Sequence, residues 1–311
     1  MTQKYAVLTV SGQSNAVGYD ESPVYEVGGY APHPRLKQLG LYDEHNLTII
    51  PLTYSPEDVQ DMRAFSHPAT PDKLGTKGIH LPLGHLLLEQ LPADYQLLVI
   101  PVAYGGTYFG SEEHGLGTYD PEQMRDVRHS PKLRWGVQSS YYKMLRDRLE
   151  YALNLHPDNV YLGNVWNQGE SDAANHTVQA QWEGFKKLVD DFVQYFDQHF
   201  PERIGATSYR DVWFNVESTH YWQELDSYQE ILAHYRQLQP ETYVAIPATT
   251  DTNQFAGTGA TTDILTAHFG NNAYETVIAP RVYARMREAG VFAGLFECFK
   301  GKEAIYRRSE L

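Results

Sequence analysis

Residues 5–16, YAVLTVSGQSNA, join a short apolar run to a polar turn that contains a serine. The apolar run, 5–10, is typical of a buried strand. Gly12 lies two residues before Ser14 and permits a tight turn directly after this strand. In open α/β sheets, ligands bind outside the carboxyl ends of the strands. The segment therefore predicts that Ser14 lies at the edge of a sheet where a ligand binds.

Similar apolar runs alternate with longer segments in which apolar residues recur every three or four positions. We expect further strands at 47–52, 97–103, 160–165, 212–216 and 242–246. We expect helices at 79–91, 138–155, 174–200 and 228–238, and a last helix at about 272–289 with Tyr274, Val277, Ile278 and Val282 on one face. The alternation predicts the α/β class, with a central parallel sheet covered by helices.

Length and composition bound the kind of protein. The 311 residues are 42% apolar and contain neither a linker nor a repeat, which predicts a single domain over 1–311. The 25 basic and 39 acidic residues give a formal net charge of −14. This charge repels phosphate backbones and anionic membranes, so we expect no nucleic-acid and no membrane partner. Composition does not indicate an oligomeric state.

The single cysteine, Cys298, excludes an intramolecular disulfide framework and every multi-cysteine zinc site. The first residues, 1–4, run directly into a predicted strand without a signal-peptide pattern, and no stretch reaches transmembrane length. A cytoplasmic location is the default expectation, and a periplasmic or secreted location stays open.

Two long segments, about 18–46 and 105–135, are rich in Gly, Pro, His and Tyr and lack a clear period. Loops of this length in a compact domain usually shape a binding site. We therefore expect both segments to contribute to the ligand-binding edge of the sheet.

Ser14 is the candidate nucleophile. If a helical turn begins at this residue, its free N–H groups favour the negative oxygen that forms during acyl transfer. The alternative is that Ser14 is an ordinary helix N-cap, which is a common position for serine. The motif also differs from the Gly-x-Ser-x-Gly elbow of α/β-hydrolases, because Gly18 lies too far downstream.

Two more motifs follow predicted strands and offer hydrogen-bond donors. Gly105 and Gly106 lie after the third strand, where their N–H groups suit an oxyanion hole; the alternative is an ordinary Gly-Gly turn. Gln168 lies after the fourth strand and has a side-chain amide that suits the same oxyanion. Of the two acids that follow, Glu170 is expected to have a structural hydrogen-bond role, and Asp172 is expected to cap the next helix.

His268 is the candidate general base. It lies just before the last predicted helix, near a strand-end loop. Imidazoles titrate near neutrality, which suits a group that takes the serine proton and returns it to the leaving oxygen. The chain has 13 histidines, so position alone does not select this one.

These motifs, taken in order, resemble the sialate O-acetylesterase branch of the SGNH hydrolases. The resemblance includes Gly12-Gln13-Ser14-Asn15, the Gly105-Gly106 turn, Trp166-x-Gln168-Gly169-Glu170-x-Asp172 and His268-Phe269, together with Asp58-Val59-Gln60-Asp61-Met62, His67-Pro68 and Trp135-Gly136. It spans most of the chain, and its Gln-Gly-Glu-x-Asp block is the most specific part.

The resemblance implies a three-layer α/β/α flavodoxin-like fold, no metal and no cofactor. It also implies an acyl-serine mechanism with Ser14 as nucleophile and His268 as base. The Ser14 N–H, the Gly105-Gly106 turn and Gln168 then form the oxyanion hole. Members of this family cleave O-acetyl esters of sialic acids, of the N-acetyl-9-O-acetylneuraminate type, or of related sugars, so the expected partner is a small acetylated sugar.

One position departs from the family pattern. Most SGNH enzymes have an aspartate three residues before the histidine, and here that residue is Leu265. Asp263 lies two positions earlier. Either Asp263 reaches the imidazole by another path, or a backbone carbonyl orients His268 and the enzyme uses a Ser-His dyad. We favour the dyad, because loss of the third triad member usually costs less than loss of the nucleophile or base.

Several residues are candidates for substrate recognition. Gln13 and Asn15 flank the nucleophile, and Tyr221 and Trp222 suit stacking against a sugar face, whereas nearby Trp213 is expected in the core. A sialic acid carboxylate needs a cationic donor. The candidates are Arg125, Arg128 and Arg134, with Arg134 preferred.

Other functions remain open at this stage. The same serine chemistry serves an acetyl-xylan or other polysaccharide O-deacetylase. A non-catalytic carbohydrate-binding protein would lack a nucleophile or base, and both are present here. Glycoside hydrolysis by Glu170 and Asp172 is disfavoured, because residues two apart on a helix do not face each other across a bond.

Overall fold

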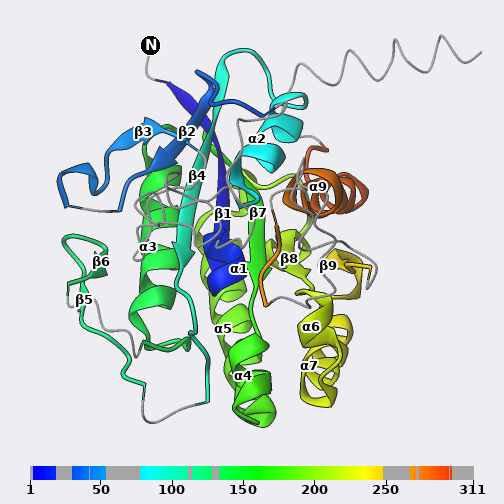
Figure 1. Cartoon of the computed structure of the whole chain (residues 1–311). Helices are drawn as coiled ribbons and strands as arrows, with labels where there is room; N and C mark the ends of the chain where they lie inside the picture. Colours follow the sequence, from blue (N-terminus) through cyan, green and yellow to red (C-terminus); the bar gives the residue numbers. More distant parts are fainter. Residues whose placement is uncertain are drawn as a thin grey trace, which may run out of the picture.

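The computed structural model describes residues 3–18, 30–41, 43–53, 78–110, 114–127, 133–247, 267–270, 273–293 and 295. Seven strands in these residues form one sheet in the order β3-β2-β4-β1-β7-β8-β9 (Figure 1). Their bounds are β1 Lys4–Gly12, β2 Leu36–Leu39, β3 Ile49–Pro51, β4 Tyr95–Ala103, β7 Val160–Asn167, β8 Trp213–Val216 and β9 Tyr243–Val244. All neighbouring strands run parallel except β3, which is antiparallel to β2 at the edge.

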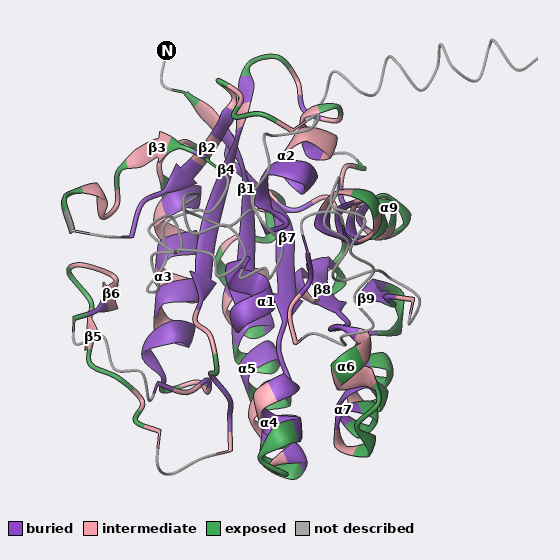
Figure 2. Ribbon diagram, in the orientation of Figure 1, coloured by how far each residue is buried: buried purple, intermediate pink, exposed green. Residues whose placement is uncertain are grey.

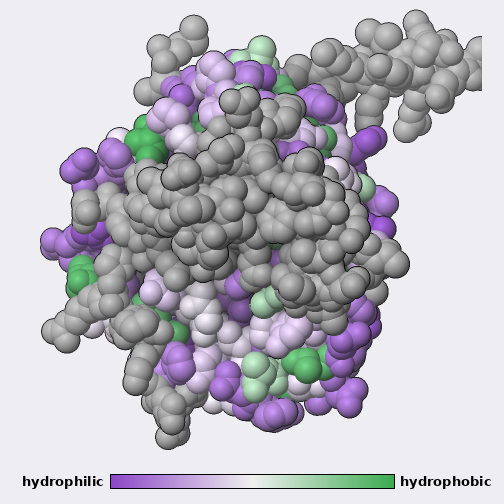
Figure 3. Space-filling view, in the orientation of Figure 1, coloured by the Kyte–Doolittle hydropathy of each residue, from purple (hydrophilic) through white to green (hydrophobic). Residues whose placement is uncertain are grey.

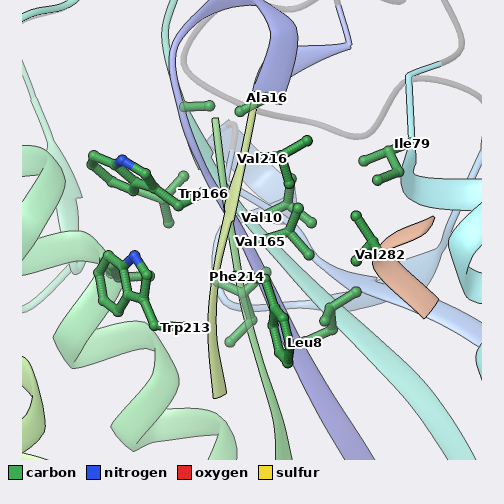
Figure 4. Close-up of a cluster of buried hydrophobic side chains, with 14 of the residues drawn as sticks. Leu8, Val10, Ala16, Ile79, Val165, Trp166, Trp213, Phe214, Val216 and Val282 are labelled. Carbon is green, nitrogen blue, oxygen red and sulfur yellow. The ribbon is translucent and has the colours of Figure 1, made fainter. Parts of the chain in front are cut away.

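Helices cover both faces of this sheet. One face contacts α3 (Ser140–Asn154), α5 (Val178–His199) and α7 (Asp226–Leu238), and the other contacts α2 (His80–Leu88) and α9 (Ala279–Glu288). Figure 4 shows Trp166 and Trp213 on one side of the strands and Ile79 and Val282 on the other. The expected α/β class and the three-layer α/β/α fold are confirmed.

Strands β1, β4 and β7 are buried nearly from end to end, because helices lie on both of their faces (Figure 2). Their Val, Ile and Leu side chains therefore form continuous apolar runs, as in other covered parallel sheets. On the described surface that is visible in Figure 3, hydrophobic residues occur in small separate patches among hydrophilic ones. No described helix has the length and apolar character needed to cross a membrane.

Several element boundaries differ from the sequence predictions. Strand β2 lies inside the 18–46 segment that we expected to be a loop, and a short hairpin of β5 (Tyr119–Asp120) and β6 (Arg125–Asp126) lies inside 105–135. Both have short strands whose formation depends on pairing with a neighbour.

Two predicted helices are also divided. The helix predicted at 174–200 is replaced by α4 (Glu170–Ala174) and α5, and the last helix begins as a π-helical turn at Tyr274–Ile278 before α9. Pro280 in the first turn of α9 has no N–H to donate, which favours an irregular turn at this point.

The order of the strands determines where Ser14, the candidate nucleophile, lies in the sheet. Strand β1 has β4 on one side and β7 on the other, and the chain visits the strands on the β4 side before those on the β7 side. The carboxyl end of β1 therefore lies at a topological switch point, where ligands bind in open α/β sheets. Ser14 begins the short helix α1 (Ser14–Val17) at this end.

Candidate active site

The carboxyl ends of β1, β4 and β7 are tied together at Gly12. This residue lies opposite Ala103 of β4 and Asn167 of β7. A Cβ at Gly12 would lie 1.9 Å from the Asn167 carbonyl oxygen, and its φ of +137° also favours glycine. The Gly12 carbonyl accepts hydrogen bonds from Trp135 Nε1 at 3.2 Å and Tyr104 N at 3.4 Å. The strand ends on either side of Ser14 are therefore fixed relative to one another.

Ser14 is the first residue of α1, and the N-cap residue is Gln13. The alternative interpretation of Ser14 as the N-cap is therefore wrong. The first N–H groups of a helix have no acceptor within the helix, so the Ser14 N–H is suited to an external oxygen. Ser14 is 8% exposed, in a turn that Gly18 closes in the left-handed conformation. The predicted roles of Ser14 as nucleophile and oxyanion donor stay predictions.

The glycine turn after β4 has an open outer side. Gly106 has a φ of +76°, which favours glycine, and among the described residues no atom lies within 4 Å of a Cβ built there. The Thr107 hydroxyl donates to the Tyr104 carbonyl at 2.9 Å and holds the turn. The requirement for glycine at 106 is therefore conformational, and the turn leaves space for a ligand beside the Gly105-Gly106 peptide.

Gln168 is fully buried, and its Nε2 donates to Asp172 Oδ2 at 2.6 Å. Its predicted role in the oxyanion hole would have to use the other amide hydrogen. Asp172 also accepts hydrogen bonds from Phe109 N at 3.1 Å and from the Thr177 hydroxyl at 2.8 Å. Burial raises its pKa to about 7, although these donors oppose the shift.

Asp172 therefore does not have the capping role that the sequence predicted. The N-cap of α4 is Gly169, and Asp172 lies inside the first turn of that helix. Its carboxylate instead joins the start of α5 to the loop that follows the glycine turn.

Glu170 is fully buried, and its hydrogen-bond partners differ from those of Asp172. Its Oε1 accepts hydrogen bonds from Asn15 Nδ2 at 3.0 Å and the Ser218 hydroxyl at 2.7 Å. Burial raises the pKa of Glu170, while hydrogen bonds from Asn15, its own backbone N–H and Ser218, and the charge of His268, lower it. Asn15 links this carboxylate to the backbone beside His268, because its Nδ2 also donates to the Ala267 carbonyl.

The backbone around His268 is bound by Asn15. The Asn15 Nδ2 donates to the Ala267 carbonyl at 3.2 Å, and Asn15 Oδ1 accepts from Phe269 N at 3.1 Å. Trp222 Nε1 donates to the same Ala267 carbonyl at 2.9 Å. The residue that follows Ser14 thus contacts the chain on both sides of His268, although the two segments are about 250 positions apart in the sequence.

Gln13 and Asn15 have structural contacts, and their predicted contacts with the substrate stay predictions. Both are nearly fully buried, and Gln13 Oε1 accepts a hydrogen bond from Ser171 N at 3.2 Å. Asn15 is occupied by the contacts described above and by the Tyr274 hydroxyl, which donates to its carbonyl at 3.0 Å. Each holds a neighbouring segment in place and is turned away from solvent.

The remaining recognition candidates occupy different environments. Tyr221 is 43% exposed and packs edge-on against the half-buried Trp222, whereas Trp213 is in the core, as expected. Arg125 donates to Gln123 Oε1 and the Leu41 carbonyl. Arg134 is partly buried, and in the described part of the chain its Nε has no hydrogen-bond partner. The pairing of Arg134 with a ligand stays a prediction.

Some sequence predictions lie outside the described residues. These are Asp263, Leu265, Arg128 and the motif segments 58–62 and 67–68. Within the described ranges, no cluster of three or more His, Cys, Asp or Glu side chains is arranged to hold a metal ion.

Ser218 is a site residue that the sequence analysis missed. It lies two residues after β8 and donates to Glu170. Its position just after a predicted strand, on the same edge as Ser14, was the available signal.

The layered sheet, with a serine after β1, a glycine turn after β4 and a late histidine held against that serine's neighbour, defines an esterase fold of the SGNH type. No family model matches the chain. A probable 9-O-acetyl-N-acetylneuraminic acid deacetylase of Escherichia coli K12 is 34% identical over 247 residues, which are 75% of this chain and 73% of that protein.

Solved structures agree with this match. The crystal structure of NanS superposes with a TM-score of 0.77 at 28% identity, over 92% of this chain and 98% of NanS. An Arabidopsis thaliana protein with a TM-score of 0.58 and 12% identity over 93% of this chain shares the fold. The chain belongs to the sialate O-acetylesterase family, and it is a carboxylic ester hydrolase.

Proposed function

We propose that this enzyme removes the acetyl group from O9 of N-acetyl-9-O-acetylneuraminate, with Ser14 as nucleophile and His268 as base. The observation that carries the proposal is the double contact of Asn15 with the backbone on both sides of His268, which brings the base beside the residue that follows Ser14. The relative from E. coli K12 supports the substrate, because its name gives this sialic acid.

The reaction has two halves. His268 takes the Ser14 hydroxyl proton as Ser14 Oγ attacks the acetyl carbonyl, and it then gives the proton to the departing sugar oxygen. The products of this half are the free sugar hydroxyl and an acetyl-serine. Water, deprotonated by His268, then attacks the acetyl-serine and releases acetate while the proton returns to Ser14.

The negative oxygen in each half needs donors that are fixed in advance. The proposed donors are the N–H of Ser14, the peptide N–H groups of Gly105 and Gly106, and the second amide hydrogen of Gln168. Asp172 supports this arrangement by holding Gln168 Nε2 from the other side at 2.6 Å.

Two groups of side chains are proposed to recognise the sugar: Arg134, and the aromatic pair Tyr221 and Trp222. Arg134 would pair with the sialate carboxylate, because a guanidinium binds a carboxylate through two parallel hydrogen bonds. Tyr221, with Trp222 beside it, offers an exposed aromatic face to the sugar. An uncharged xylan has no carboxylate for Arg134, so this residue favours the acidic sugar over xylan.

The location and partners are part of the same proposal. The enzyme would act in the cytoplasm as a single domain on a small acetylated sugar. The net charge of −14 disfavours nucleic acids and anionic membranes as partners.

The test is acetate release from 9-O-acetylated N-acetylneuraminate and from acetylated xylan, with p-nitrophenyl acetate as a substrate that needs no sugar recognition. We expect kcat/KM on the sialate to exceed that on xylan by at least about a hundredfold, the size of one lost charge-assisted pair. Equal or faster cleavage of xylan would identify a polysaccharide deacetylase. Binding of the sialate without any acetate release would identify a carbohydrate-binding protein.

A further inference from the structure

The backbone beside His268 is held from two sides of the site. The Ala267 carbonyl accepts hydrogen bonds from Asn15 Nδ2 at 3.2 Å and from Trp222 Nε1 at 2.9 Å. A carbonyl oxygen has two lone pairs, so these two donors fill its acceptor capacity. Asn15 belongs to α1, and Trp222 belongs to α6 (His220–Gln223). The bond from the indole N–H is the shorter of the two that fix the residue directly before the base.

The position of the Trp222 ring is set by the ends of two strands. The next residue, Gln223, donates from Nε2 to the Ser218 carbonyl after β8 at 2.9 Å and to the Ile246 carbonyl after β9 at 3.1 Å. The Trp222 ring is half-buried and packs against the hydrophobic core. A side chain that is anchored in this way offers its N–H at a fixed place, as a residue that supports a catalytic group must.

The exposed part of α6 is aromatic. Tyr221 is 43% exposed, and its ring centroid lies 5.0 Å from that of Trp222, with the two rings edge to face at 87°. Tryptophan combines a large apolar ring system with one polar N–H. The N–H of Trp222 binds the backbone before the base, while its ring adjoins the surface where the sugar is proposed to bind. One side chain thus connects the base with the sugar-binding side.

We propose that Trp222 is a positioning residue for His268 and that its ring is at the same time part of the sugar-binding side. The N–H holds the Ala267 carbonyl and so keeps the imidazole within reach of Ser14. The proposal rests on the proposed function, because it takes His268 as the base and the aromatic pair as the sugar-binding side. It concerns the backbone of the base and is independent of which group orients the imidazole ring.

The first test separates the N–H from the ring. Trp222→Phe keeps an aromatic ring and removes the donor, so kcat should fall about 3-fold to 10-fold on both the 9-O-acetylated sialate and p-nitrophenyl acetate, which is the effect of one hydrogen bond. KM for the sialate should change less than about twofold. Trp222→Leu also removes the ring, so it should lower kcat to the same extent and raise KM for the sialate about fivefold. A wild-type kcat in Trp222→Phe, or an unchanged KM in Trp222→Leu, would overturn the proposal.

The second test asks whether Trp222 acts through His268. In a chain that already carries His268→Ala, adding Trp222→Phe should slow the residual hydrolysis of p-nitrophenyl acetate by less than about twofold. The reason is that a residue that acts through another has no further effect once the other is gone. A role in folding or in the oxyanion hole would lower the residual rate again by the full factor. Such a further loss would contradict the proposal.

The matched control is Trp182→Phe. Trp182 is also a half-buried tryptophan, but it lies between α5 and α7, where its ring stacks on that of His234 at a centroid distance of 4.6 Å. This variant loses the same atoms and should keep the wild-type kcat on both esters. An equal fall of kcat in both variants would mean that the smaller ring, and not the lost N–H, is the cause, which is also incompatible with the proposal.

The benzothiophene analogue of tryptophan keeps the test decisive if Trp222→Phe folds poorly. At position 222 this analogue has the shape of the indole, but a sulfur atom without a hydrogen replaces the N–H, so it donates no hydrogen bond. We expect the same loss of kcat as in Trp222→Phe, with a melting temperature close to that of the wild type. A wild-type kcat with the analogue in place would remove the N–H from the positioning of the base.

The two esters and the His268 variant distinguish a failure of this proposal from a failure of the proposed function. If the wild-type chain cleaves only p-nitrophenyl acetate, the sialate assignment and the sugar-binding role of the ring have failed, and the N–H of Trp222 is still tested on that ester. If His268→Ala alone keeps a normal rate, the base is assigned wrongly, and the positioning role of Trp222 fails with it. If His268→Ala is slow and Trp222→Phe slows it further, only the role of Trp222 has failed.

Discussion

Two buried carboxylates, Glu170 and Asp172, follow β7 and contact different parts of the molecule. Glu170 faces the site, where Asn15 and Ser218 bind it close to His268. Asp172 lies on the side of the glycine-turn loop and the start of α5, here called the scaffold region. Gln168, Thr177 and the backbone of Phe109 donate hydrogen bonds to it. The difference follows from helical geometry, because residues two apart on a helix point in different directions. The same short block thus supplies one acid that binds the residue beside Ser14 and one that binds the loop after the glycine turn.

The largest effect expected on the site region comes from Ser14→Ala. Without the hydroxyl there is no acetyl-serine, so kcat should fall by at least about four orders of magnitude on both esters. Ser14 begins a short helix, and alanine is compatible with that position, so the melting temperature should change little. Calorimetry alongside the acetate assay checks both expectations. Retention of normal rates would remove Ser14 from the mechanism.

The contacts of Asp172 in the scaffold region are tested by the pH dependence of the free energy of unfolding. Burial raises its pKa to about 7 in the folded protein, above the value of about 3.9 in an unfolded chain. Because the folded state holds the proton more strongly, this contribution to stability is fully present below about pH 4 and is lost as the pH rises through 7.

Asp172→Asn removes this titration. The free energy of unfolding of the wild type should therefore fall relative to that of Asp172→Asn between pH 4 and 7, by up to about 1.4 kcal/mol per pH unit. Urea titrations across this range measure the difference. A pH-independent difference would show that the donors around Asp172, namely Gln168, Thr177 and the backbone N–H groups of Phe109 and Gly110, keep it ionised throughout.

The sequence predicted the central part of the fold well because that part depends on local pattern. Strands β1, β4 and β7 are long apolar runs, and they lie within two residues of their expected bounds at each end. Strand β2 was missed because only Leu36 and Leu39 are apolar, and its conformation depends on pairing with Leu97 and its neighbours in β4.

The site was predictable only in part, for a similar reason. Ser14 and the glycine turn are recognisable from the residues directly around them. The contacts of Asn15 and Glu170 join residues about 150 to 250 positions apart in the sequence, and no local pattern contains that information. For the same reason, the sequence did not show that the Asn15 amide contacts the backbone around His268.

The smallest effect expected concerns the edge of the site region, where Arg134 and Arg125 provide a matched pair. Arg134→Ala should raise KM for the 9-O-acetylated sialate by about 10-fold to 100-fold, the cost of one charge-assisted hydrogen-bonded pair, and leave p-nitrophenyl acetate hydrolysis unchanged. Arg125 already donates to Gln123 and Leu41, so Arg125→Ala should leave KM for the sialate unchanged. Initial rates over a range of sialate concentrations separate the two variants. If KM rises for Arg125→Ala and stays constant for Arg134→Ala, the carboxylate pairs with Arg125 instead of Arg134. If it rises for neither, the selectivity of the site comes from the aromatic side at Tyr221.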